Sequence, residues 1–318
     1  MKSAAGILLM AASITQGHAA APADLAAYQA LAQQDLRLAT IGYRLAKANA
    51  PFCDRKMQNP GWVLHDEAQY PDKGLAKTAF VFRAPVAISS VVAGGEAERL
   101  GLGAGDGIVA VDGINVTAPD SVKMERASAR VESIQTALND AFAKSEAVIV
   151  SVVTAAGATD VKLQPTAVCK SQFWVDTKSK LNAGADGLSV RVTEGLMTFT
   201  AEDDAELAAV VAHEMSHNLL GHRDRLATTG RGNKQVLATE MEADRLSVWL
   251  MKNAGYDPAA ALRFIERYGR KAGLGIFSDG THLRWRSRQK LMQAEILLMT
   301  QRDERNGLQS PPFLGLSN

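Results

Sequence analysis

The run His213-Glu214-Met215-Ser216-His217 constrains the fold more than any other feature, because it lies inside a segment of helix-forming residues, 203–219. An α-helix turns by about 100° per residue, so side chains four positions apart lie on one face, about a turn apart. His213 and His217 therefore point to the same side and could bind one zinc ion at Zn–N distances of about 2.0–2.1 Å. The helix must pack with this face toward a further ligand.

Glu214 is offset from His213 by about 100° around the same helix, beside the expected metal position rather than on it. There its carboxylate can hold a water molecule, which is the H-E-x-x-H arrangement of zinc peptidases. The chain has six histidines among 318 residues, so this spacing has little chance of arising by accident. We expect one Zn²⁺ per chain, with Glu214 as the general base.

A catalytic zinc also needs a third protein ligand and an open fourth position for water. His222 lies five residues beyond His217, about 140° further around the helix, so we expect it to face solvent or to cap the helix end. The better candidate is Glu240, on the next predicted helix, with Asp244 one turn later on the same face. We expect Glu240 to bind the metal and Asp244 to orient a ligating imidazole through its other nitrogen.

Charge and hydropathy narrow the class of protein. The 35 Lys and Arg residues against 34 Asp and Glu give a net charge of +1, which disfavours nucleic acid as a partner. After the N-terminus no apolar stretch approaches the ~18 residues that a membrane span needs. We therefore expect polypeptide substrates, no nucleic acid, and no transmembrane segment once the N-terminal signal is removed.

The first residues indicate export. Lys2 precedes a short apolar run at 4–12, and small residues at 17 and 19 predict a signal peptide with cleavage after Ala19. We expect a periplasmic or secreted protein. In such an oxidising compartment Cys53 and Cys169 could pair. The alternative is two unrelated thiols, because sequence alone does not show that two cysteines lie close together in space.

The hydrophobic pattern changes along the chain. It predicts a helix over 22–50, a loop rich in Pro, Gly and Asp over 59–74, and a strand pair at 173–177 and 188–192, followed by helices to about residue 299. Between these regions it predicts a helix over 131–143 and short strands at 80–82, 88–92, 108–111, 148–153 and 161–163. We expect the strand over 187–192 to be an edge strand that aligns substrate.

The central region resembles a bacterial PDZ domain. The pieces that carry the resemblance are Gly94-Gly95-Glu96-Ala97, Leu100-Gly101-Leu102, Gly105-Asp106-Gly107-Ile108 and Val111-Asp112-Gly113. The resemblance implies that an extended peptide binds by strand addition at a sheet edge. The alternative is a β-rich domain that only packs against its neighbour.

The C-terminal half resembles the zinc metallopeptidase family of the CAAX prenyl protease and the bacterial heat-shock protease HtpX. The matching pieces are Asn182-Ala183-x-Ala185, Gly195-Leu196, 206–210, the HEMSH run, Glu240-x-x-x-Asp244, 254–258 and Thr281-His282. The resemblance implies zinc on His213, His217 and Glu240, Glu214 as base, Asp244 behind the ligands, and supporting roles for His282 and Arg288. Of these last two, we expect His282 or Arg288 to donate a hydrogen bond to the oxyanion that forms during hydrolysis. It also implies that the PDZ-like domain is inserted, so that a Cys53–Cys169 bridge would join the two crossing points.

These inferences together predict an α+β chain in which a zincin-like metallopeptidase domain, made of active-site helices and a small sheet, carries a PDZ-like β-rich domain. The predicted divisions are a signal peptide at 1–19, an N-terminal helical segment of the peptidase at 20–77, the PDZ-like domain at 78–166, the metallopeptidase domain at 167–300 and a loose tail at 301–318. The expected function is an exported endopeptidase that cleaves unfolded or extended protein segments in envelope quality control. The alternative is a periplasmic PDZ-based chaperone or adaptor with a structural zinc and no proteolysis.

Overall fold

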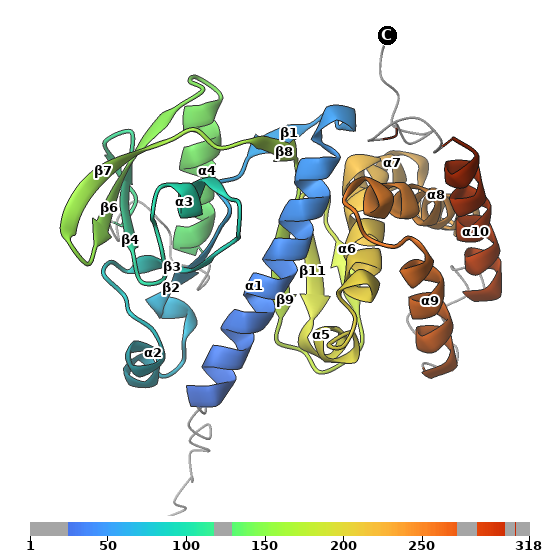
Figure 1. Ribbon diagram of the computed structural model, residues 1–318, viewed down its shortest axis with the longest axis horizontal. Coiled ribbons are helices and arrows are strands. Elements are labelled where there is room, and N and C mark those ends of the chain that lie inside the picture. Colours follow the sequence, from blue (N-terminus) through green and yellow to red (C-terminus); the bar gives the residue numbers. More distant parts are fainter. Residues whose placement is uncertain (1–24, 118–128, 272–284, 303–308, 310–318) are drawn as a thin grey trace, which may run out of the picture.

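A computed structural model describes residues 25–117, 129–271, 285–302 and 309. Within these residues the chain forms two lobes, each with its own group of buried apolar side chains (Figure 1). The first, called the helical lobe, comprises the described parts of 25–58 and 167–302, and the second, the β-rich lobe, those of 59–166. The predicted signal peptide at 1–19 and the predicted site residue His282 lie outside the described residues.

The helical lobe contains a three-stranded sheet covered by helices. Its elements are α1 (Leu25–Ala48), the 3-10 turn η1 (Ala50–Phe52), β1 (Lys56–Gln58), β8 (Ala167–Cys169), β9 (Gln172–Asp176), β10 (Ala183–Ala185), β11 (Ser189–Thr193), α5 (Glu194–Phe199), α6 (Asp204–Leu219), α7 (His222–Thr229), α8 (Asn233–Asn253), α9 (Ala259–Lys271) and α10 (Trp285–Arg302). The predicted N-terminal helix is confirmed as α1, which buries Leu38, Ile41 and Leu45 almost completely. These three residues recur at helical spacing, so one face of α1 closes the core.

The three-stranded sheet corrects one expectation. Its order is β10-β11-β9, with β11 parallel to β9 and antiparallel to β10. The strand predicted at the edge is therefore the central one, and the two edge strands are β10 and β9. The short sequence Ala183-Gly184-Ala185 has no alternating hydrophobic pattern, so its pairing could not be recognised from local composition.

The β-rich lobe is built on a larger sheet, with the strand order β2-β3-β4-β6-β7 and β5 paired to β4. Its elements are β2 (Trp62–Asp66), the 3-10 turn η2 (Glu67–Gln69), α2 (Lys73–Ala79), β3 (Val86–Val91), α3 (Glu96–Arg99), β4 (Gly107–Val111), β5 (Ile114–Asn115), α4 (Ala129–Phe142), β6 (Val148–Thr154) and β7 (Gly157–Leu163). Most of the predicted strands and the predicted helix are confirmed. The mixture of helix and sheet agrees with the α+β expectation.

Two local predictions in this lobe were wrong. The Pro- and Gly-containing loop predicted over 59–74 contains β2, which pairs with β3 and so places sheet residues before 78, the predicted start of the PDZ-like domain. The strand predicted at 80–82 is absent from the described structure. Instead, the ring of Phe82 stacks on His65 with centroids 4.3 Å apart, and Phe80 packs edge-on against the same ring. These aromatic residues are held by side-chain packing rather than by strand pairing.

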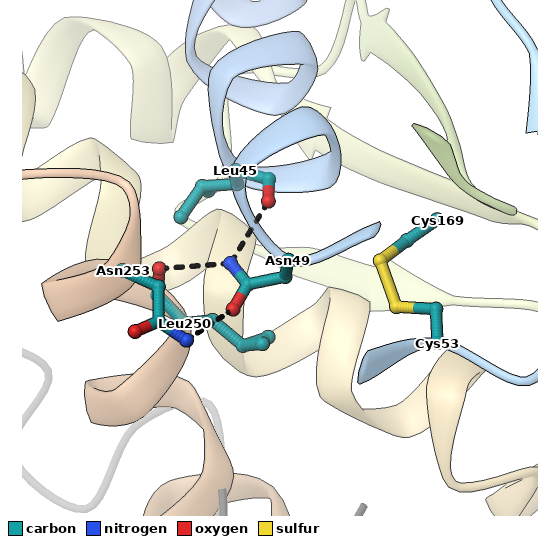
Figure 2. Close-up of a disulfide and its surroundings, with 6 residues drawn as sticks. All are labelled: Leu45, Asn49, Cys53, Cys169, Leu250 and Asn253. Carbon is teal, nitrogen blue, oxygen red and sulfur yellow. Dashed lines mark hydrogen bonds between the residues drawn. A yellow bond between two sulfur atoms is a disulfide. The ribbon is translucent and has the colours of Figure 1, made fainter. Parts of the chain in front are cut away.

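The two lobes are joined where the chain leaves and re-enters the helical lobe. β1 and β8 pair antiparallel, with Lys56 opposite Cys169. Beside this pair lies the predicted Cys53–Cys169 disulfide, with the two Cα atoms 5.5 Å apart (Figure 2). The same end of α1 is tied to α8 by Asn49, whose amide nitrogen donates to the Leu45 and Leu250 carbonyls at 2.9 and 3.0 Å. The junction is thus held by backbone pairing, a covalent bond and a buried amide.

Among the described helices, none combines the length and the apolar character that crossing a membrane requires. Figure 1 shows α1 along the boundary between the lobes, with α6 and α8 on its other side. The motif helix α6 therefore sits inside the helical lobe rather than on its surface.

Candidate metal centre

Helix α6 begins at a well-formed cap and presents both histidines of the motif. The Asp203 carboxylate accepts hydrogen bonds from the backbone N–H groups of Ala205 and Glu206 at 2.9 and 3.2 Å, as a helix N-cap does. One turn separates His213 from His217, and their Nε2 atoms lie 3.2 Å apart. Both imidazoles therefore face one point, as their spacing predicts.

Helix α8 packs against α6 and brings Glu240 to the same point. Glu240 Oε2 lies 3.4 Å from His213 Nε2, and Oε1 lies 3.4 Å from His217 Nε2. A tetrahedral zinc with bonds of about 2.0–2.1 Å has ligand atoms about 3.3–3.4 Å apart along each edge. The three observed separations are close to that edge, so the residues fit three vertices of a tetrahedral ion, and no fourth His, Cys, Asp or Glu of the described part of the chain joins them.

A second layer of polar groups stands behind His213. Asp244 Oδ1 lies 3.0 Å from His213 Nδ1, and Arg288 of α10 contacts both carboxylate oxygens at 2.5 and 2.8 Å. Asp244 and Arg288 are 1% and 4% exposed, which removes this pair from solvent. The arrangement keeps a hydrogen on Nδ1 of His213, so that Nε2 faces the metal position.

The same contacts shift two pKa values in the metal-free protein. Burial by itself raises the pKa of Asp244, but the Arg288 charge and the hydrogen bonds outweigh it and lower the pKa to about 2. Burial alone lowers the pKa of His213, but its hydrogen bonds to Asp244 and Glu240 raise it to about 10. Without metal, His213 therefore carries a second proton, which a metal ion must displace.

His222 is placed differently from the expectation. Its ring is 1% exposed, with Nδ1 2.8 Å from His217 Nδ1 and Nε2 3.1 Å from Glu242 Oε2. The solvent-facing prediction was wrong because α6 ends at Leu219 and Gly221 adopts a left-handed conformation, φ 61°. After that turn the 100° step of α6 no longer predicts the direction of a side chain. Gly221 is itself a helix-stop signal that sequence analysis could have used.

Glu214 lies between two hollows of different character. On one side is an apolar pocket of about 40 Å³, lined by Leu196, Phe264 and Ile265 among others. On the other is a cleft of about 600 Å³ between the β10–β11 turn, α7 and α8, which also contacts His217 and Glu240. Glu214 is half-buried and lines the same cleft as His217 and Glu240, two of the three residues that could hold the metal.

Six of the predicted site residues are brought together here: His213, Glu214, His217, Glu240, Asp244 and Arg288. His282 is outside the described residues. Two residues that sequence reasoning did not assign to the site, His222 and Glu242, join it through His217.

Comparison with known proteins finds one family match. Residues 146–239 match the model of peptidase family M48, a segment that includes the H-E-x-x-H run and ends one residue before Glu240. A search of the curated proteins finds no match. The family match supports a zincin-like metallopeptidase, a hydrolase that acts on polypeptides. Peptidases of this family depend on zinc, and His213, His217 and Glu240 could hold it.

Proposed function

We propose that the chain is an exported zinc-dependent endopeptidase, with one Zn²⁺ held by His213, His217 and Glu240. The observation that carries the proposal is the ligand triangle, whose sides of 3.2, 3.4 and 3.4 Å suit a tetrahedral ion, with Glu214 lining the cleft that reaches it. Three protein ligands with a free vertex are typical of catalytic rather than structural zinc sites.

When bound, zinc lowers the pKa of a water molecule toward ~7 and polarises the scissile carbonyl group. Glu214 would accept a proton from the attacking water on a carboxylate oxygen and would then deliver it to the leaving amine. Asp244 keeps the Nδ1 hydrogen of His213 in place, and Arg288 holds Asp244. Arg288 therefore acts as a positioning residue, while donation to the oxyanion is left to His282.

The substrate in this proposal is an extended polypeptide segment. β10 is one edge of the three-stranded sheet, and its residues Ala183 and Ala185 each line one of the two hollows that meet at Glu214. A peptide that adds to this edge pairs through its backbone, which places its scissile bond in the cleft. The apolar pocket of about 40 Å³ then takes one small side chain. Folded proteins do not offer such segments, so unfolded ones are the expected substrates.

Export to the periplasm and a role in envelope quality control complete the proposal. The Cys53–Cys169 bridge, at the buried junction of the lobes, supports an oxidising compartment. We assign the β-rich lobe the predicted PDZ-like role of holding an extended peptide, and we place the enzyme closest to the CAAX protease and HtpX group. The rival reading, a chaperone with a structural zinc, does not explain a carboxylate beside an open vertex.

The test is metal analysis of the purified protein together with a casein digestion assay, with and without a chelator. We expect one zinc per chain and digestion that chelation abolishes. Glu214→Gln should keep its zinc and lose about 10²–10⁴-fold in turnover, whereas His213→Ala should lose the metal as well. Glu266→Gln, on the outer side of α9 where it pairs with Arg270, is the matched control and should digest normally. Undiminished proteolysis by Glu214→Gln would exclude it as the base.

A further inference from the structure

His222 has no role in the proposed mechanism, yet it is among the most buried polar residues described, at 1% exposed. It starts α7 directly after the left-handed Gly221, a turn that returns the chain toward α6. Its ring meets the ring of His217 edge-on, with centroids 4.8 Å apart. A polar ring so well buried needs partners for both nitrogens, and both are present.

The two contacts of His222 determine where the hydrogens lie. If His217 binds the metal through Nε2, its neutral ring carries the hydrogen on Nδ1. That hydrogen points to His222 Nδ1, 2.8 Å away, which must then accept. His222 in turn carries its hydrogen on Nε2 and donates it to Glu242 Oε2 at 3.1 Å. Arg225 donates to the same carboxylate oxygen at 2.7 Å and completes the chain.

The two ligating imidazoles are thus supported in parallel but by different chemistry. His213 donates its outer hydrogen to the Asp244 carboxylate, which is backed by Arg288. His217 donates to a neutral imidazole, which is backed by Glu242 and Arg225. In each case an acceptor on Nδ1 excludes the tautomer that would put a hydrogen where the metal binds.

We propose that His222 is a positioning residue for the metal centre: it accepts the Nδ1 hydrogen of His217 and so holds Nε2 of that ring toward the ion. This role rests on the proposed function, because His217 needs a fixed tautomer only if it binds a metal. His222 touches neither the ion nor the substrate in this assignment.

The experiment measures zinc affinity directly, by competition with a chromophoric chelator, on the full chain and without a proteolysis assay. His222→Phe removes the acceptor and fills the space, and we expect affinity to fall by about 10–100-fold. His222→Asn keeps an acceptor near the Nδ1 position and should recover part of the loss. The matched control is His65→Phe in the β-rich lobe, equally a buried histidine, bonded to Tyr70 at 2.9 Å, which should bind zinc normally.

A second readout separates positioning from mere packing. The visible absorption of the Co²⁺-substituted protein reports ligand geometry, so it should change in His222→Phe and stay unchanged in His65→Phe. Wild-type zinc affinity with an unaltered Co²⁺ spectrum in folded His222→Phe would overturn the assignment. If His222→Phe does not fold, Glu242→Leu is the deciding variant, because it removes the acceptor that holds the hydrogen of His222 on Nε2. Unchanged zinc affinity in Glu242→Leu would also overturn the assignment. Failure of the wild type to bind zinc would instead refute the proposed function itself.

Discussion

The substitution Asp244→Asn tests the layer behind the metal ligands. Asp244 lies between Arg288 and His213 and is 1% exposed. The amide keeps the shape but removes the charge, so the Arg288 guanidinium stays buried without its counter-ion. Removing one partner of a buried ion pair costs about 3–5 kcal/mol of the free energy of unfolding. Weakening the acceptor for His213 should also lower zinc affinity by about 10–100-fold, or about 1.4–2.8 kcal/mol.

A double variant separates these two losses. Asp244→Leu with Arg288→Met removes both charges and leaves apolar side chains of similar size, an exchange that is often neutral or stabilising. We therefore expect the stability of the double variant to return close to that of the wild type. Its zinc affinity should stay low, because His213 Nδ1 still has no carboxylate to hold its hydrogen.

The assays are urea unfolding in excess chelator, which reports the metal-free protein, and chelator competition for zinc. Unfolding in chelator matters because bound zinc would itself stabilise the folded state. Recovery of both stability and zinc affinity in the double variant would refute the positioning role of Asp244. Wild-type zinc affinity in Asp244→Asn would refute it as well.

Three further predictions concern protons and the disulfide. In the metal-free protein the pKa of His213 is raised to about 10 and that of His217 is lowered to about 3. Zinc binding should therefore displace one proton, and zinc affinity should rise about tenfold per pH unit between pH 6 and 8. A slope near zero or near two in chelator competition would contradict this. Burial raises the pKa of Asp35 from 3.8 to about 6, so the folded protein favours the neutral carboxyl. This preference contributes up to about 3 kcal/mol to the free energy of unfolding below pH ~4, and the contribution is lost as the pH rises through 6. Asp35→Asn should flatten that dependence in urea unfolding from pH 4 to 8, and an unchanged profile would argue against it. The double variant Cys53→Ser with Cys169→Ser opens a loop of 116 residues. It should lower the free energy of unfolding by up to about 5 kcal/mol through chain entropy, measured by thermal unfolding. An unaltered melting temperature would show that β1–β8 pairing alone holds the junction.

Helical periodicity was enough to predict several parts of this protein from its residues alone. Residues four apart share a helix face whatever the surroundings, so the convergence of His213 with His217, and of Glu240 with Asp244, needed only the 3.6-residue repeat. The same holds for α1, whose apolar spacing reflects the face that it buries.

Tertiary structure decided where the chain goes after an element ends and which elements become neighbours. His222 faces the metal centre because the chain reverses at Gly221, and β11 became a central strand because the pattern-free β10 pairs beside it. Arg288 reaches Asp244 only because α10 packs on α8. These contacts join residues that are distant in sequence or separated by a turn. Their free energy comes from burial and pairing between elements, which a local sequence pattern does not predict.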